Sequence, residues 1–576
     1  MNENSNLGSK LESITNYIEK YFENWNIPGF ALGIVKDGNI IFSKGFGYRN
    51  LDDKLPMTDE TIFEIASCSK SFTATICAKL VDLGMLEWDK PVQNYIPEFQ
   101  LHDKVLSQRI TVRDMLSHRT GLPRHDYLWL DKSLTFEKLL KHLKHLELTK
   151  DARMEFQYCN LMYIMVVYLI EKVMNKSYKE VFKEMIFDPL KMSSTSMSLS
   201  KMLENSNHSL AYRYMGEDIE KFELEDDPIS SGAGDIKSNI IDMCKWLLFY
   251  LNNGKVNGEE IISEKNFKNV ITPTMPLGLI DNNPILVNKS LSPSYALGWG
   301  NEVYCGHMVI SHTGGKNNFS SQIIFLPFDN IGIVSFTNIN APFCIPINYF
   351  IINTLLELDE VDFCARIEPM FLETKKIFKD NKVNVLKNKI PDTKPYFPIN
   401  EYLGTYQHDG AGEIKIQEKD GNLQMIINNY SCELEHFHYD SFLYGLLKFS
   451  TYDIVTFIQN KEGEIDSLKI PLEPTLSPFY FYRVPDEKLF DEAYLRSFIG
   501  EYTHLGSFFT IFIENKKLFY KFKEFPYSEL IPVRKNRFKW KDMKNITIEF
   551  KYEDKTLIGA VVKVTGSARP LSKKIK

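Results

Sequence analysis

Apolar residues recur along the first third of the chain with two different periods. Residues 11–25 carry them at helical spacing, which predicts an amphipathic helix. The pattern then changes, and residues 29–35 and 39–47 are predicted as two strands of a hairpin. Residues 67–83 are apolar on nearly every face and are followed by Gly84. This segment predicts a helix that is buried inside a domain and ends at a glycine.

Helical and strand patterns continue in an order that defines one domain. Residues 160–174 and 240–251 are predicted as helices, and residues 323–326 and 331–337 as strands. Strands therefore open and close the region 10–360, and helices fill its middle. This order predicts an α+β (mixed α/β) domain in which the terminal strands meet in one sheet and a helical subdomain is inserted.

The remainder of the chain is strand-rich and contains an internal repeat. Residues 361–398 are charged and proline-containing, which indicates a linker. Residues 402–410 then match residues 498–506 at a constant offset, and alternating strand patterns follow both copies. We expect two small all-β, barrel-like domains, at 399–485 and 493–573.

The composition limits the kinds of binding partner and cellular location that we expect for the protein. The 576 residues include 68 basic and 75 acidic side chains, a net charge of -7, which gives no reason to expect nucleic acid as a partner. No segment has the length and apolarity of a membrane span, and residues 1–10 do not resemble a signal peptide, so we expect a cytoplasmic protein. The eight cysteines form no CxxC pair, so no disulfide framework or structural zinc site is expected. The motifs described below imply no metal or organic cofactor either.

Ser67-Cys68-Ser69-Lys70 opens the buried helix and is the first candidate for chemistry. Residues three apart share a helix face, so the Lys70 amine can reach the Ser67 hydroxyl. Burial disfavours the ammonium form, which lets the lysine accept a proton and activate the serine. The same pattern recurs at Ser198–Lys201 without a buried context. There we expect only a helix N-cap and a surface lysine.

Two further motifs could complete such a site. Tyr158-Cys159-Asn160 precedes the second buried helix: a tyrosine near a lysine can be held as a phenolate or relay a proton, and an asparagine amide can orient the lysine and the substrate. The structural alternative is a helix cap and a core aromatic. Ser311–Gly315 places two glycines in a strand, which suits a substrate approaching the backbone, or alternatively a bulge or a turn.

Together these motifs resemble the serine β-lactamase and penicillin-binding-protein family. Within it, the chain is similar to the branch of class C β-lactamases, D-peptidases and esterases. Residues 63–66, 116–123 and 298–300 add further matches, and the resemblance covers roughly residues 10–355. The C-terminal copies resemble the lipocalin-like β-domains that often follow this catalytic domain. The resemblance thus implies a β-lactamase/transpeptidase-like sheet with a helical subdomain.

The resemblance also implies roles for individual residues. Ser67 would be the acylated nucleophile, and Lys70 and Tyr158 would share the general-base and general-acid work. Backbone N–H groups of Ser67 and Gly315 would form the oxyanion hole. The residues implied to bind substrate are Asn160, His312, Thr313, Gly314 and Gly315. His312 stands where a lysine is usual, and a histidine is only partly charged near neutral pH. The resemblance therefore does not carry over a preference for carboxylate-bearing antibiotics.

The function predicted from these observations is that of a serine hydrolase that works through an acyl-enzyme on small amides or esters. D-amino-acid peptides and carboxylic esters are the expected substrates. A β-lactamase is the second interpretation, and a catalytically idle scaffold or binding protein is the third. The partners expected are a small-molecule or peptide substrate and a second copy of the chain, bound through the C-terminal β-domains.

Neighbouring side chains offer alternatives with less support. We expect Cys68 and Cys159 to pack rather than to react, because a helix turns Cys68 about 100° away from Ser67. A further cluster could hold a metal ion but matches no known metal-ligand spacing, so we interpret it as a structural loop. Its members are His118, Arg119, Arg124, His125 and Asp126.

Overall fold

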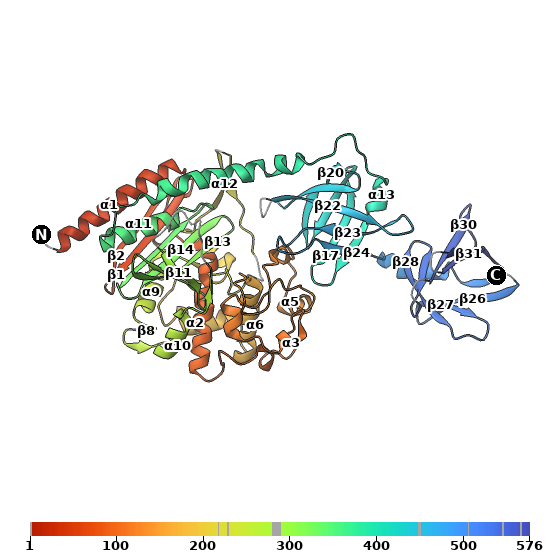
Figure 1. Ribbon diagram of the computed structural model, residues 1–576, viewed down its shortest axis with the longest axis horizontal. Coiled ribbons are helices and arrows are strands. Elements are labelled where there is room, and N and C mark those ends of the chain that lie inside the picture. Colours follow the sequence, from red (N-terminus) through yellow and green to blue (C-terminus); the bar gives the residue numbers. More distant parts are fainter. Residues whose placement is uncertain are drawn as a thin grey trace. The chain divides into compact units, whose positions relative to one another are not determined.

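The computed structural model describes residues 3–216, 218–226, 230–278, 290–446, 451–504, 506–543, 546–564 and 567–575 (Figure 1). The chain forms two compact units. The first contains Met1–Asn384 together with the short segment Leu472–Ser477, and the second contains Val385–Pro471 and Pro478–Lys576.

The first unit is built on a nine-stranded sheet whose centre joins the two ends of the domain. The strand order is β10-β11-β12-β13-β14-β15-β1-β2-β3. Strand β1 (Gly29–Lys36) pairs with β2 (Asn39–Asn50) on one side and with β15 (Ile331–Thr337) on the other, with Phe30 opposite Thr337. The remaining strands are β3 (Leu55–Pro56), β10 (Met275–Pro276), β11 (Ser290–Tyr295), β12 (Gly300–Tyr304), β13 (His307–Lys316) and β14 (Phe319–Leu326). The predicted meeting of terminal strands in one sheet is confirmed.

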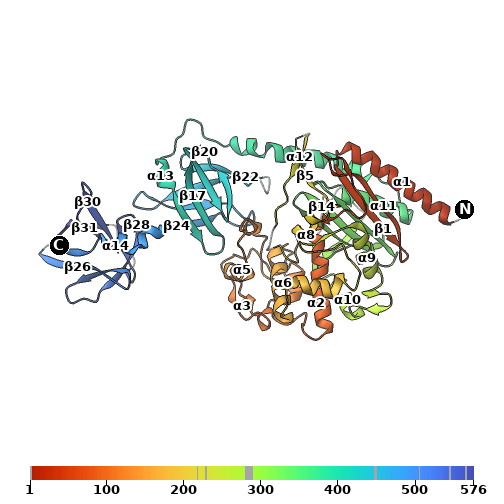
Figure 2. The same ribbon diagram turned by 180° about the vertical axis from the view of Figure 1, so that it is seen from behind.

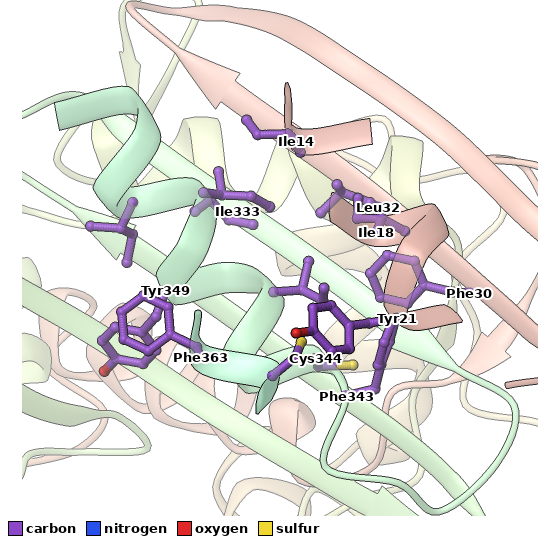
Figure 3. Packing of buried hydrophobic residues seen from close by; sticks show 14 of the residues in the cluster. Ile14, Ile18, Tyr21, Phe30, Leu32, Ile333, Phe343, Cys344, Tyr349 and Phe363 are labelled. Carbon is purple, nitrogen blue, oxygen red and sulfur yellow. The ribbon is translucent and has the colours of Figure 1, made fainter. Parts of the chain in front are cut away.

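Helices cover both faces of this sheet (Figures 1 and 2). Helices α1 (Glu3–Asn24) and α11 (Cys344–Leu356) pack on one face, where Ile14 and Ile18 of α1 meet Leu32 of β1 (Figure 3). Gly33, one residue on, points to the other face, where a Cβ would lie 2.6 Å from Ile240 of α9 (Ile240–Leu251). The alternation of a strand thus buries β1 on both sides.

The helical subdomain lies between the two halves of the sheet in sequence. Helix α2 (Ser69–Asp82) contacts α6 (Asn160–Met174) and α10 (Glu264–Ile271), and α6 also contacts α4 (Val112–Leu116). Residues 160–170 of α6 are buried without interruption, as their apolar pattern predicts. The inserted helical subdomain is therefore confirmed.

Helix α12 (Phe363–Leu386) occupies much of the segment that composition marks as a linker. Its first turns bury Phe363, Ile367 and Phe371 in the same core as α1 and α11. The first unit thus continues past residue 360, the predicted end of the domain, and reaches Asn384.

The second unit consists of two β-sheets whose strand orders follow the repeat. The first is β19-β18-β17-β16-β24-β23-β22-β21-β20, and the second is β30-β29-β28-β27-β26-β25-β33-β31-β32, which an extra β30–β31 pairing closes. These strands are β16 (Gly404–His408), β17 (Gly412–Lys419), β18 (Asn422–Ile427), β19 (Tyr430–Glu433), β20 (Glu435–His438), β21 (Ser441–Leu446), β22 (Thr451–Gln459), β23 (Ile465–Ile470), β24 (Phe479–Val484), β25 (Gly500–His504), β26 (Ser507–Glu514), β27 (Lys517–Phe522), β28 (Ser528–Arg534), β29 (Arg537–Trp540), β30 (Ile546–Glu553), β31 (Thr556–Val564), β32 (Ser567–Ala568) and β33 (Ser572–Lys574).

One hydrogen bond occurs at the same place in both copies of the repeat. The Tyr406 hydroxyl donates to the carbonyl oxygen of Tyr402 at 2.9 Å, and the Tyr502 hydroxyl donates to that of Phe498 at 2.8 Å. Both tyrosines are buried. The predicted fold class, a mixed domain followed by two barrel-like β-domains, is confirmed.

Two further observations concern the whole of the described chain. None of its helices combines the length and the apolarity needed to cross a bilayer. All eight cysteines are free thiols.

Candidate active site

Ser67 lies at a sharp turn between a short strand and the buried helix α2. The chain passes from β4 (Phe63–Glu64) into one turn of 3-10 helix, η1 (Ala66–Cys68), and directly on into α2. Ala66 has a φ of 48°, a left-handed conformation that costs a non-glycine residue about 1–3 kcal/mol. Burial of Ala66 and Cys68 on either side holds this strained turn in place. The turn sets Ser67 at the amino end of α2, where the helix dipole favours negative charge.

Lys70 is fully buried directly beneath Ser67. Its Nζ lies 3.1 Å from Ser67 Oγ and donates to the carbonyl oxygen of Ala233 at 2.7 Å. The rings of Tyr158 and Tyr163 lie 4.9 and 5.2 Å from the same Nζ. Burial, and next the charge of Arg124, hold the Lys70 pKa well below the usual lysine value. A neutral amine at this position has a lone pair with which to take the Ser67 proton.

Tyr158 and Asn160 reach the site from the start of α6. Burial raises the pKa of the Tyr158 hydroxyl above its usual value, although the Ser67 side chain and Arg124 lower it. The phenol therefore keeps its proton, so of the two states expected from sequence only the proton relay fits. Asn160 is buried, and its Oδ1 has no hydrogen-bond partner among the residues that the structure describes.

Strand β13 lies on the opposite side of the site from α6. Its packing accounts for one of its two glycines. A Cβ on Gly314 would lie 2.4 Å from the carbonyl oxygen of Ile65 and 3.0 Å from the backbone nitrogen of Ser67. Close packing against the turn that holds Ser67 thus requires a glycine at position 314, in addition to any approach of a substrate. A Cβ on Gly315 would meet no atom within 4 Å. Gly315 and Ser67 line the same cavity.

His312 is neutral, which corrects the expectation of partial charge. Burial lowers its pKa to about 3. Nδ1 lies 2.6 Å from the carbonyl oxygen of Thr313, which can only accept, so Nδ1 carries the proton. The Tyr295 hydroxyl donates to the other ring nitrogen, Nε2, at 2.8 Å. His312 is therefore a fixed polar wall without charge.

The structure brings most of the predicted residues around one cavity of about 450 Å³. The residues that line it are Ser67, Arg124, Tyr158, Tyr295, Gly300, Ser311, His312, Thr313 and Gly315. Lys70 contacts Ser67, and Gly314 packs against the turn that holds Ser67. Asn160, at the start of α6, is not among the lining residues. The cysteines are not part of the cavity lining, and burial raises the pKa values of Cys68 and Cys159 to about 12, which leaves both thiols unreactive.

Arg124, Tyr295 and His118 are residues of the site that sequence reasoning did not assign to it. His118 is buried against the rings of Tyr158 and Tyr163, with centroids 4.2 and 5.1 Å away, and its Nδ1 accepts from the backbone N–H of Cys159 at 3.0 Å. Two signals were present, the 116–123 motif and the cluster of charged residues that includes His118 and Arg124. Both mark this loop but not which of its side chains turn inward. Among the described residues, no group of three His, Cys, Asp or Glu side chains is placed to hold a metal ion.

Comparison with known proteins identifies the family of this chain. The Beta-lactamase family model matches residues 14–349, more than half of the chain. The chain belongs to this family. A second model, a domain of unknown function (DUF3471), matches residues 388–480, which include most of the first β-sheet of the second unit.

Relatives and solved structures agree with that assignment. The chain is 28% identical to the unguisins hydrolase ungD' of Aspergillus campestris over 426 residues, which is 69% of this chain and 76% of that protein. It is 26% identical to Protein flp of Staphylococcus aureus over 58% of this chain and 64% of that protein. The octameric penicillin-binding protein homologue of Pyrococcus abyssi shares the fold, with a TM-score of 0.53 and 18% identity over 90% of this chain and 99% of that one.

Proposed function

We propose that this protein is a serine hydrolase that acts on small amides or esters through an acyl-enzyme at Ser67. The observation that carries the proposal is the 3.1 Å separation of Lys70 Nζ from Ser67 Oγ, with the lysine fully buried. An amine that is neutral at rest and within hydrogen-bond reach is what an unactivated serine hydroxyl requires. A surface lysine would be protonated and unable to serve.

The reaction follows from the positions of these groups. The Ser67 hydroxyl gives its proton to Lys70 as Oγ attacks the substrate carbonyl carbon. The oxyanion that forms is stabilised by the backbone N–H groups of Ser67 and Gly315, each contributing about 3 kcal/mol. Tyr158, which holds its proton, passes it to the leaving amine or alcohol as the C–N or C–O bond breaks, and regains one from Lys70. Water then hydrolyses the ester on Ser67 and restores the free hydroxyl.

The proposed substrates are D-amino-acid peptides or carboxylic esters. Similarity to two unguisins hydrolases supports hydrolysis. The neutral state of His312 gives no support to the β-lactamase alternative, because it offers no cation where that chemistry commonly places a lysine. The intact arrangement of Ser67, Lys70 and Tyr158 argues against an idle scaffold.

Labelling by an active-site probe tests the proposal. The wild-type protein and its Ser67→Ala variant are incubated with a fluorophosphonate or a fluorescent penicillin, and intact mass is recorded. We expect one adduct on the wild-type chain and none on the variant. Absence of an adduct with both probes, or equal labelling of the two proteins, would contradict an activated Ser67.

We also propose that the C-terminal β-domains mediate a homo-oligomer. The octameric state named for the Pyrococcus abyssi homologue, whose chain this protein covers almost completely, supports it. Light scattering on the full-length protein should give a multiple of the 67.0 kDa chain mass. A monomer at micromolar concentration would contradict this proposal without affecting the hydrolase proposal.

A further inference from the structure

The cavity beside Ser67 contains a cation that the proposed reaction does not use. Arg124 lines the cavity with Ser67 and Tyr158, and its guanidinium carbon lies 5.0 Å from the centre of the Tyr158 ring. Its Nε donates to Asp126 at 2.6 Å. Within the described part of the chain, Nη1 and Nη2 have no hydrogen-bond partner, and the side chain is 52% exposed. The guanidinium is therefore fixed at one edge and free to bind a ligand with the other.

Arg124 is also the sole permanent cation among the described residues that line this cavity. Lys70 is buried behind Ser67, and its proposed work requires the neutral amine. His312 is uncharged, because it donates to the carbonyl oxygen of Thr313 and accepts from Tyr295. An anionic group entering the cavity thus has one side chain with which to form an ion pair.

The segment that carries Arg124 is held by a hydrogen bond to a residue that is distant in sequence. His125 has a left-handed backbone, with a φ of 48° and a ψ of 38°, and its N–H donates to Glu473 Oε2 at 2.9 Å. The Glu473 side chain is buried, and its Oε1 accepts from the Thr475 hydroxyl at 2.8 Å. Glu473 belongs to Leu472–Ser477, which follows β23 in sequence but is part of the first unit.

A charged hydrogen bond to the residue next to Arg124 has a clear consequence. It satisfies a backbone N–H in a strained turn and so favours the one conformation that directs residue 124 to the cavity. Glu473 would thus act through the backbone and never touch the substrate.

We infer that Arg124 binds a carboxylate of the substrate and that Glu473 is the positioning residue that keeps it in place. The substrate class is then a small amide or ester that carries a carboxylate near the scissile bond. This inference rests on the proposed function of Ser67. The carboxylate could stand on the acyl side or on the leaving group, and matched substrates distinguish the two.

The experiment compares three chromogenic esters on the full-length protein. p-Nitrophenyl butyrate is neutral, p-nitrophenyl glutarate carries a carboxylate on the acyl side, and 4-nitro-3-carboxyphenyl butyrate carries one on the leaving group. We expect one anionic ester to exceed the neutral ester in kcat/KM. The Arg124→Gln substitution should lower that ratio about 10- to 100-fold, mainly through KM, and Arg124→Lys should lower it less.

Variants of Glu473 test the positioning role. Glu473→Ala should lower the same ratio several-fold through KM, and Glu473→Gln, which keeps an acceptor oxygen, should restore most of it. Arg496→Gln is the matched control, because Arg496 is an exposed arginine that also pairs with one carboxylate, that of Glu492. An equal fall for all three esters in Arg124→Gln would overturn the inference and indicate an effect on Lys70 or Tyr158 instead.

A binding measurement separates this inference from the proposed function. In the Ser67→Ala protein, calorimetry with monoethyl glutarate and with ethyl butyrate requires no turnover. Tighter binding of the anionic ester that disappears on adding Arg124→Gln would support the carboxylate site even if no ester is hydrolysed. Equal binding of both compounds to the Ser67→Ala protein would refute it even if Ser67 is labelled by the fluorophosphonate.

Discussion

The chain carries the Ser-x-x-Lys pattern twice, and the two copies have different structures. At Ser67–Lys70 the lysine is fully buried and its Nζ lies 3.1 Å from the serine Oγ. At Ser198–Lys201 the lysine is exposed, and the serine Oγ instead accepts from the lysine backbone N–H at 3.3 Å, as the N-cap of α8 (Leu199–Glu204). The pattern fixes only that both side chains share a helix face. Burial decides whether it can make a base.

Removal of the two serines should give the largest contrast. Ser67→Ala should lower probe acylation about 10³-fold or more, because the variant lacks the hydroxyl that Lys70 contacts. Ser198→Ala should leave acylation unchanged and cost only the cap, about 1 kcal/mol of stability. Intact mass after fluorophosphonate treatment, with a thermal melt of each variant, checks both. Residual labelling of Ser67→Ala at the wild-type rate would remove the distinction between the two copies.

Substitution of the two lysines should give a smaller difference in activity, in the same direction. Lys70→Met keeps an unbranched buried side chain but removes the base, and should lower kcat/KM for an ester about 10²- to 10⁴-fold. Lys201→Met should fall within twofold of wild type, since that side chain is exposed. Steady-state kinetics on p-nitrophenyl esters gives the comparison. Comparable losses in both variants would show that burial of Lys70 is irrelevant to its role.

The glycines of β13 sharpen the contrast, because they act only on the first copy. Gly314→Ala should destabilise the first unit by about 1–3 kcal/mol and slow acylation, since the new methyl group would press on Ile65 and Ser67. Gly315→Ala meets open space and should destabilise far less. Thermal melts and labelling rates distinguish them. Equal melting temperatures for the two variants would mean that β13 yields easily, contrary to the packing seen here.

The pH dependence gives the smallest change and the most specific one. Burial and Arg124 hold the Lys70 pKa below the usual value, so kcat/KM should rise with pH as Lys70 deprotonates and level off before the usual lysine range. Arg124→Gln removes a like charge, so the Lys70 pKa should rise and this limb should move to higher pH. His312, with a pKa of about 3, should add no inflection near neutrality. Profiles over about pH 4–10 check the sign.

Local patterns predicted the elements that carry the site better than the contacts among them. The apolar runs at 67–83 and 160–174 correctly indicated buried helices, and the predicted approach of Ser67 and Lys70 follows from helix geometry. Ala233, whose carbonyl oxygen holds Lys70 Nζ, is distant in sequence and belongs to no periodic pattern. Arg124 and Glu473 share this problem, because their positions depend on tertiary contacts between distant segments.

The segment 361–398 shows a signal that was present but outweighed. Its charge and its prolines favoured a connector, yet Phe363, Ile367 and Phe371 recur every four residues, as one face of a helix requires. The structure buries that face in the core of the first unit. The charge state of His312 could not be derived from sequence at all, since it depends on burial and on the bonds to Thr313 and Tyr295.

The pairing of β1 with β15 constrains how the first unit can fold during its synthesis on the ribosome. Phe30 leaves the exit tunnel about 300 residues before its partner Thr337, an interval of roughly 15–60 s at typical elongation rates. During that time the β1–β2 hairpin can form, but one edge of β1 has no strand to pair with and its apolar faces lack α11. Synthesis therefore imposes a long aggregation-sensitive stage, and folding of the first unit can be completed only after β15 has been synthesised.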